Sequence, residues 1–338
     1  MRSVWAVFAL LIVGGSGFAQ PSATFQVEGR HLYDPCGERV VLRGVNAMIL
    51  YWDRLGETTY PEIAKTGANA VRIFWHAESD ATPEQLDQTL ANCWANNMIP
   101  IICVWDATGK WEAFEKCVAF WESEEIAAVI NKHEGHVLVN IANEAGDGSV
   151  SQETYREAYI DAVQRLREAG YRMPLIIDAG NWGRDEDYLF ENAAALLEAD
   201  PLDNLIFSWH PWDTEQPDSR YISAFDRAGE MGICMIVGEF SHIGVFYEKP
   251  IPYELIIEEC QARDIGWLAW VWWCCRDDYD GHTISADKTY GNWANDPWGE
   301  NLIVESAYGI EATAERTAYL KTGECASSVA PNVAPADH

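Results

Sequence analysis

Two glutamates stand at the ends of apolar runs, at the point where a strand would leave the core. Glu144 closes the run "HVLVNIANE", and Glu239 lies near the end of "ICMIVGEF". A buried carboxylate is costly unless it is paired, so each is either a satisfied structural acid or the reactive group of a site. If both face one opening, one can protonate a leaving oxygen while the other attacks or activates water, which is the chemistry of glycoside hydrolysis.

The elements that would hold these glutamates alternate regularly along the chain. Short apolar runs are separated by longer amphipathic stretches from residue 40 to about residue 272, which is typical of strand–helix units with a parallel sheet. The eight predicted strands are residues 39–46, 68–75, 98–106, 136–144, 173–181, 205–212, 233–240 and 266–273.

Helix signals lie between these strands. In "TPEQLDQTLANCWANN" Thr82 is the expected N-cap and Pro83 the first helical residue, and in "SQETYREAYIDAVQRLREAG" Ser151 is the cap and Gly170 the stop. Eight strands, each followed by a helix, predict an α/β fold of the (β/α)₈ TIM barrel type. A doubly wound open sheet is the alternative, which the absence of a G-x-G-x-x-G motif after the first strand disfavours.

The two ends of the chain differ from the barrel. Residues 1–19 carry one basic residue, an apolar run and small residues up to Ala19, which predicts a signal peptide rather than an uncleaved membrane anchor. Residues 25–41 predict a short N-terminal β-hairpin that covers one end of the barrel. We therefore expect a single catalytic domain over residues 20–325, a disordered tail over residues 326–338, and a secreted, extracellular protein.

Charge and cysteine content limit the partners. There are 53 acidic and 23 basic residues, a formal net charge of −30, which repels nucleic acid and anionic membranes and suits a neutral substrate. The acidity can equally serve solubility. Nine cysteines leave at least one unpaired in a monomer, and their scattered spacing does not resemble a zinc site. We expect no cofactor, no metal and, because no hydrophobic interface is apparent, a monomer.

Polar and aromatic residues gather at the carboxyl ends of the predicted strands, where barrels of this kind place their chemistry. The chain also holds 16 tryptophans, whose ring faces stack on sugars. Taken alone, Arg72 and His210 could be structural partners of buried acids, and part of the tryptophan cluster at residues 266–273 must be core because alternate strand residues face opposite ways. Facing the opening we expect Asn46, Arg72, Trp105, Asp106, Asn143, Glu144, Asp178, Asn181, His210, Trp212, Glu239, Trp270 and Trp272.

The motifs "VVLRGVN", "ANAVRIFW", "DATG", "VLVNIANEA", "IIDAGNWG", "LIFSWH", "IVGEFSH" and "GWLAWVWW" together resemble glycoside hydrolase family 5, most of all its bacterial endo-β-1,4-mannanase branch. The similarity runs from about residue 25 to residue 310. It implies a retaining mechanism, with Glu144 as acid/base and Glu239 as nucleophile on carboxylates about 5 Å apart.

The resemblance also implies roles for the residues around the two glutamates. Arg72 would keep Glu239 ionised, and Asn143 would bind the 2-hydroxyl of the sugar being cleaved. His210 matches the sixth-strand histidine of the family, and Trp270 matches the tryptophan that floors the subsite of that sugar. The substrate-binding set is therefore Arg72, Asn143, His210, Trp212, Trp270 and Trp105.

Three residues depart from the pattern of the related mannanases. Trp105 replaces a sugar-binding histidine, Trp212 replaces a tyrosine whose hydroxyl donates to the nucleophile, and Ala145 follows the acid/base where many relatives have Pro or Trp. The first two changes alter the subsite beside the cleaved bond.

The leading hypothesis is an endo-β-1,4-mannanase acting on mannan, glucomannan or galactomannan. An endo-β-1,4-glucanase or mixed-linkage β-glucanase of the same family is an alternative with the same chemistry. From a different class comes a carbohydrate-binding barrel with weak or lost catalysis, which the presence of both glutamates disfavours. A metal-dependent enzyme is a remote option that rests on the acidic segment 277–281, a partial match to a calcium loop.

Overall fold

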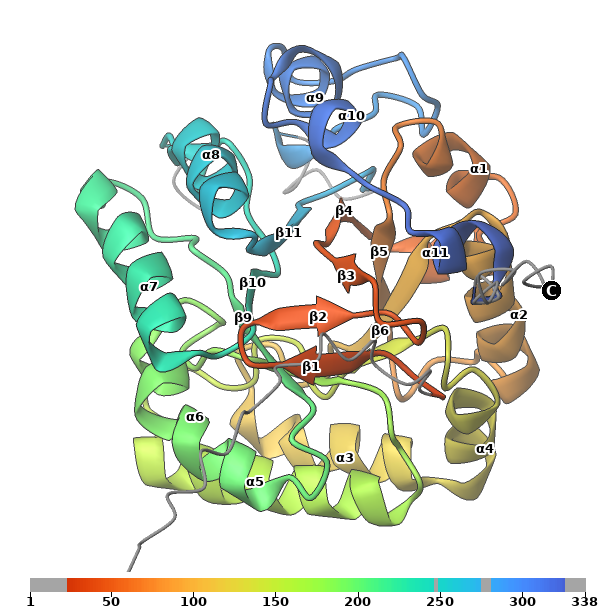
Figure 1. Ribbon diagram of the computed structural model, residues 1–338, viewed down its shortest axis with the longest axis vertical. Coiled ribbons are helices and arrows are strands. Elements are labelled where there is room, and N and C mark those ends of the chain that lie inside the picture. Colours follow the sequence, from red (N-terminus) through yellow and green to blue (C-terminus); the bar gives the residue numbers. More distant parts are fainter. Residues whose placement is uncertain (1–22, 246–248, 275–280, 326–338) are drawn as a thin grey trace, which may run out of the picture.

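Eight parallel strands close into a barrel in the order β10-β11-β4-β5-β6-β7-β8-β9, surrounded by helices (Figure 1). The structure is a computed structural model that describes residues 23–245, 249–274 and 281–325. The predicted (β/α)₈ barrel is confirmed, and the open sheet is excluded because the barrel is closed. The barrel strands are β4 (Arg43–Ala47), β5 (Ala70–Trp75), β6 (Ile99–Val104), β7 (Leu138–Asn140), β8 (Leu175–Asp178), β9 (Leu205–Trp209), β10 (Met235–Val237) and β11 (Gly266–Ala269).

The helices fill the connections between these strands. The β6–β7 connection holds two helices, and within the described residues the chain after β11 forms only short helical turns. In chain order they are η1 (Ile49–Tyr51), α1 (Thr59–Ala64), α2 (Pro83–Ala95), η2 (Trp111–Ala113), α3 (Phe114–Glu122), α4 (Glu124–Lys132), α5 (Gln152–Glu168), α6 (Asp187–Ala199), α7 (Asp218–Met231), α8 (Tyr253–Arg263), α9 (Trp298–Glu300), the π-helical η4 (Asn301–Glu305), α10 (Ile310–Thr313) and α11 (Ala318–Thr322).

The predicted helix caps are confirmed. The Thr82 side chain accepts from the backbone N–H of Gln85, which completes a capping box at the start of α2. Ser151 accepts from the backbone N–H of Thr154 at the start of α5, and Gly170 follows that helix with a left-handed φ of 95°. These local signals set where α2 and α5 begin and where α5 ends.

A small antiparallel sheet closes one end of the barrel. It has three strands, β1 (Gln26–Glu28), β2 (His31–Tyr33) and β3 (Arg39–Val40), so the predicted hairpin gains a third strand. That third strand is the beginning of the run that we assigned to the first barrel strand. Figure 1 shows the sheet lying across the barrel, and its apolar side chains pack on residues at the amino ends of the barrel strands, such as Ile99 and Leu138. The carboxyl ends of the strands therefore form the free mouth.

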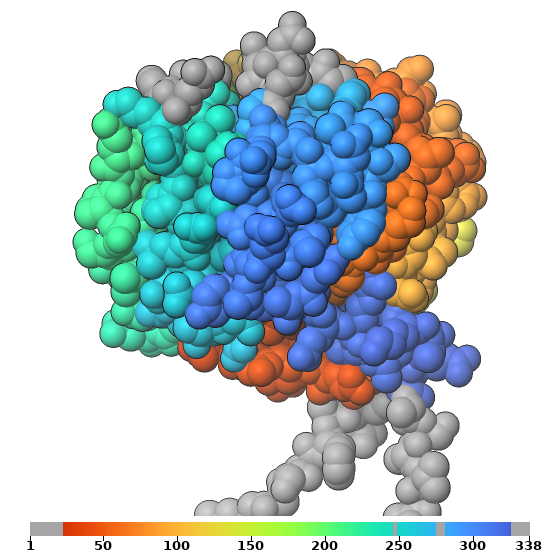
Figure 2. Space-filling view, turned by 90° about the horizontal axis from the view of Figure 1, so that it is seen from above, coloured from red at the N-terminus to blue at the C-terminus, as the bar shows by residue number. Residues whose placement is uncertain are grey.

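A disulfide joins the two ends of the described chain. Cys36 and Cys325 are bonded, with Cα atoms 5.2 Å apart, and Figure 2 shows the first and last described segments side by side. Five other cysteines are free and buried: Cys93, Cys103, Cys117, Cys234 and Cys260. Cys274 is also buried. The predicted signal peptide and the predicted tail lie outside the described residues. Among the helices described, none combines the length and the apolar character needed to cross a bilayer.

Candidate active site

A cleft of about 320 Å³ opens at the carboxyl ends of the strands. Six of the eight catalytic and substrate-binding residues predicted from the sequence line it directly, namely both glutamates, three tryptophans and Asn143. Arg72 and His210 are buried behind the glutamates, 1 % and 0 % exposed. The lining residues are Met48, Phe74, Trp105, Thr108, Asn143, Glu144, Trp182, Arg184, Trp212, Glu239, Val245 and Trp270.

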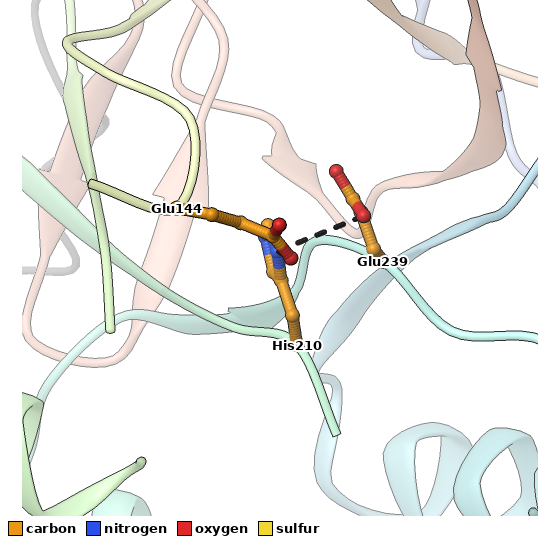
Figure 3. A group of neighbouring side chains, drawn as sticks. All are labelled: Glu144, His210 and Glu239. Atoms are coloured by element: carbon orange, nitrogen blue, oxygen red, sulfur yellow. Dashed lines mark hydrogen bonds and ion pairs between the residues drawn. The ribbon is translucent and has the colours of Figure 1, made fainter. Parts of the chain in front are cut away.

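The two glutamates face each other across this cleft (Figure 3). They lie in the loops just after β7 and β10, because the hydrogen-bonded strands end earlier than predicted. One oxygen of Glu144, one oxygen of Glu239 and a ring nitrogen of His210 all lie within 4.8 Å of one another. Glu144 and Glu239 are 8 % and 3 % exposed, so each carboxylate reaches solvent only through the cleft.

Arg72 is the buried cation that organises the floor of the site. Its Nη1 donates to Oε1 of Glu239 at 2.6 Å, and its Nη2 donates to Oδ1 of Asn143 at 2.6 Å. The same Nη2 lies 3.1 Å from Oδ2 of Asp178, and Asn140 accepts from both Nε and Nη2. These partners hold the Arg72 guanidinium in one position, and the guanidinium in turn fixes the side chains of Glu239 and Asn143 relative to each other.

The two glutamates have different electrostatic surroundings. Burial raises the pKa of Glu144 well above its usual range, and the negative charges of Glu239 and Asp178 raise it further. Burial also raises the pKa of Glu239, to about 7, while Arg72 and a hydrogen bond from Trp212 oppose that rise. Glu239 therefore loses its proton at a lower pH than Glu144, which leaves one carboxylate and one carboxylic acid in the same cleft.

His210 is placed to hold Glu144 in its protonated form. Its Nδ1 lies 2.8 Å from Oε1 of Glu144, and its Nε2 lies 3.1 Å from Oγ of Ser208, whose hydroxyl also bonds Asp178. Burial and Arg72 lower the pKa of His210 well below its usual value, so the ring is neutral. If Ser208 donates to Asp178, Nε2 of His210 must donate to Ser208, and Nδ1 must then accept the proton of Glu144.

Asn143 and Trp212 present N–H groups on opposite sides of the site. Nδ2 of Asn143 donates to Oγ1 of Thr108 at 2.8 Å, and this amide, which lines the cleft, has a second N–H to donate. The indole N–H of Trp212 donates to Oε2 of Glu239 at 3.3 Å. Trp212 thus supplies Glu239 with a hydrogen-bond donor, as the tyrosine hydroxyl expected at this position would.

The tryptophans divide between cleft and core. Trp270 lines the cleft and packs edge-on against Phe74 and Trp212, with ring centroids 5.1 and 6.4 Å apart. Trp267 in β11 is fully buried, so part of the tryptophan cluster is core, as expected. The prediction for Trp272 is wrong: it lies beyond the end of β11, is fully buried, and donates its indole N–H to the backbone carbonyl of Lys288 instead of facing the opening. Trp105 also lines the cleft.

A sequence profile described as Cellulase (glycosyl hydrolase family 5) matches residues 33–275. The chain belongs to glycoside hydrolase family 5. The mannan endo-1,4-beta-mannosidase of Salipaludibacillus agaradhaerens is 30% identical over 302 residues, which cover 87% of this chain and 94% of that protein. The enzyme of the same name from Cellvibrio japonicus is 30% identical over 333 residues, covering 93% of this chain and 75% of that protein.

Solved structures of the family have the same fold as this chain. The mannohexaose complex of the Thermomonospora fusca beta-mannanase superposes with a TM-score of 0.80 at 26% identity, and the match covers 88% of this chain and 100% of that chain. The resemblance seen in the sequence motifs is thereby confirmed, and this chain is a glycoside hydrolase whose two glutamates sit together as a family 5 mechanism requires.

Glu144, His210 and Glu239 also form a set of atoms that could contact a metal ion. Carboxylate and imidazole donors suit divalent transition metals. Arg72 places a fixed positive charge 2.6 Å from Glu239, however, and that charge opposes a second cation. The set is better suited to the acid–base chemistry of a family 5 hydrolase. The segment 277–281, considered above as a calcium loop, lies outside the described residues except for Gly281.

Six lining residues were not named from the sequence, three of them the apolar Met48, Phe74 and Val245. The other three, Thr108, Trp182 and Arg184, each lie in a loop beyond the strand end rather than at it, so strand periodicity does not mark them. The motifs "DATG" and "IIDAGNWG" that carry the family resemblance contain Thr108 and Trp182, and these motifs are the signal that could have found them. A Cβ on Gly109 would lie 2.0 Å from the Trp182 ring, so the two motifs pack directly on each other.

Proposed function

We propose that this protein is an endo-β-1,4-mannanase that hydrolyses internal linkages of mannan, glucomannan or galactomannan with retention of configuration. The observation that carries the proposal is the pair of glutamates within 4.8 Å of each other and of His210, with Arg72 bonded to one of them. Retaining glycosidases hold their carboxyl groups about 5 Å apart, whereas inverting ones leave room for a water. The relatives named above supply the mannan substrate class.

Glu239 acts as the nucleophile in this proposal, because Arg72 and the Trp212 N–H stabilise its ionised form. It attacks the anomeric carbon while Glu144 gives its proton to the departing oxygen, and the glycosidic bond breaks as the Glu239–sugar bond forms. Glu144, now a carboxylate, then takes a proton from water, which attacks the anomeric carbon and releases Glu239. The second N–H of Asn143 binds the 2-hydroxyl, and Trp270 lies beneath the ring.

The location of the enzyme is part of the proposal. The disulfide between Cys36 and Cys325 supports a protein that works in an oxidising compartment outside the cytoplasm. A polymeric substrate, which does not enter cells, fits the same location.

Reducing-sugar release from galactomannan, glucomannan and β-glucan, measured side by side, tests the substrate. Release from the two mannans is expected. Release from β-glucan alone would show that the enzyme is a glucanase. Binding of a polymer without release of sugar from any of them would support the carbohydrate-binding alternative.

Two substitutions test the assigned roles. Glu239→Ala and Glu144→Ala are each expected to lower turnover by about a thousandfold or more on mannan, because each removes a group that acts in the transition state. Azide should restore turnover of an activated aryl glycoside by Glu144→Ala with a β-configured product, since the anion replaces the missing base on the covalent intermediate. A variant close to wild type in rate would show that its glutamate has another role.

A further inference from the structure

Arg184 stands on the wall of the cleft beside the acid/base, and the mechanism proposed above gives it no task. It follows β8, and Glu144 follows the neighbouring strand β7. The backbone between them is in close contact, because a Cβ on Gly183 would lie 3.1 Å from Cγ of Glu144 and 2.7 Å from Nδ1 of His210. Arg184 is therefore held on the Glu144 side of the cleft.

The backbone of Arg184 is fixed, but its guanidinium is held loosely. Its carbonyl accepts from Nε1 of Trp209 at 2.9 Å and from Nη2 of Arg220 at 3.1 Å. In contrast, its Nη1 lies 3.4 Å from Asp213, which makes a shorter contact of 2.8 Å with Arg220, and its Nε lies 3.4 Å from the carbonyl of Asn181. Both guanidinium contacts are long for charge-assisted hydrogen bonds, so donor capacity remains on the cleft side.

The order of the strands shows which part of the substrate lies next to Arg184. Glu239 follows β10, and Trp270 follows the adjacent β11, so the sugar that Glu239 attacks lies on that side. Glu144 must reach the oxygen that links this sugar to the next one. The sugar that leaves is then on the β7–β8 side of the mouth, where Arg184 is found.

We propose that Arg184 binds the leaving-group sugar by donating hydrogen bonds from its guanidinium to neighbouring hydroxyl groups of the ring. This inference rests on the proposed endo-acting glycosidase. The fork of a guanidinium matches two adjacent oxygen acceptors, and Trp182 on the same wall offers a ring face for the same sugar. Arg184 thus determines how strongly the enzyme holds the aglycone part of its polymer.

The test measures how the Arg184→Ala variant cleaves two mannosides that have different leaving groups. When mannohexaose is cleaved, the leaving group is an oligosaccharide. When an aryl β-mannotrioside is cleaved at its aryl bond, the leaving group is a phenolate and no sugar lies beside Arg184. We expect kcat/KM for mannohexaose to fall by about tenfold, as for loss of a hydrogen bond to a charged donor, and kcat/KM for the aryl glycoside to stay at the wild-type value. Arg184→Lys should recover part of the loss, since it keeps the charge without the fork.

Arg227→Ala is the matched control. It removes an arginine whose partners, Asp187 and Glu191, are surface residues, and both substrates should be cleaved as by the wild type. An equal loss on both substrates in Arg184→Ala, or no loss on either, would overturn the role of Arg184. A wild-type enzyme that cleaves neither mannoside would instead overturn the proposed function on which that role depends.

Discussion

At the residue scale, the site depends on keeping two identical side chains in different protonation states. Glu239 has a guanidinium and an indole N–H within hydrogen-bonding distance. Glu144 has a neutral His210 as its partner and the negative charges of Glu239 and Asp178 nearby. Burial raises both pKa values and the charge of Arg72 opposes both rises, but only Glu239 also receives hydrogen bonds from Arg72 and Trp212 that favour its charge. The surroundings rather than the residue type therefore distinguish the two carboxyl groups.

Trp212 offers a direct test of this argument. Its N–H stabilises the ionised form of Glu239, so Trp212→Phe should raise the pKa of that carboxyl above about 7. The nucleophile must be ionised, so the acidic limb of the kcat/KM–pH profile should move to higher pH, by about one unit at most. Trp212→Tyr supplies a hydroxyl donor and should retain activity with a smaller shift. An acidic limb that moves to lower pH in Trp212→Phe would contradict this account.

At the element scale, the loop between β8 and α6 brings its backbone against Glu144. Gly183 adopts a left-handed φ of 71°, and its carbonyl accepts from the backbone N–H of His210 at 2.8 Å. With no Cβ, the residue lets the loop approach both Glu144 and His210. The same loop carries Trp182 and Arg184 into the cleft, so one glycine connects Glu144 to the wall beside it.

Gly183→Ala should therefore lose activity beyond its effect on stability. The new methyl would force His210 and Glu144 to move, and left-handed backbone strain should add about 1–2 kcal/mol of destabilisation. Gly232→Ala is the control, because Gly232 has a similar φ of 69° and no atom within 4 Å of the position of a Cβ. Thermal unfolding should show a loss of stability in both variants, larger in Gly183→Ala because its methyl also displaces buried side chains, and kcat should fall only in Gly183→Ala. Equal kcat values would show that the approach of this loop is not needed.

At the scale of the whole molecule, stability and chemistry are separated to opposite ends of the barrel. The three-stranded sheet packs on the amino ends of the strands, and the Cys36–Cys325 bond ties that sheet to the last described segment. The cleft lies at the carboxyl ends, away from both. Changes at the sheet should therefore alter the free energy of unfolding without altering the site.

The double variant Cys36→Ser/Cys325→Ser tests that separation. The bond spans 289 residues, and closing so long a loop restricts the unfolded chain, so its loss should cost about 3 kcal/mol or more. Denaturant unfolding should show this loss, while kcat at 25 °C stays at the wild-type value. A reducing agent should destabilise the wild type to the level of the variant and leave the variant unchanged. Unchanged stability on reduction would show that the bond contributes nothing.

Much of this protein can be predicted from its sequence, because local rules act within each element. Apolar periodicity identified eight strands, cap residues such as Thr82 and Ser151 marked helix starts, and a charged residue after an apolar run marked Glu144 and Glu239. The carboxyl ends of the strands of a parallel barrel all lie at one mouth, so the predicted strands alone place the two glutamates in the same opening.

Other features were decided only by the tertiary structure. The split of residues 39–46 between β3 and β4 depends on pairing with β2, and the choice of Cys36 and Cys325 depends on contact between residues 289 positions apart. The place of Arg184 depends on a loop whose left-handed backbone no periodicity encodes. The physical reason is the same each time: these features follow from contacts between distant parts of the chain, and a local pattern carries no information about which distant residues will meet.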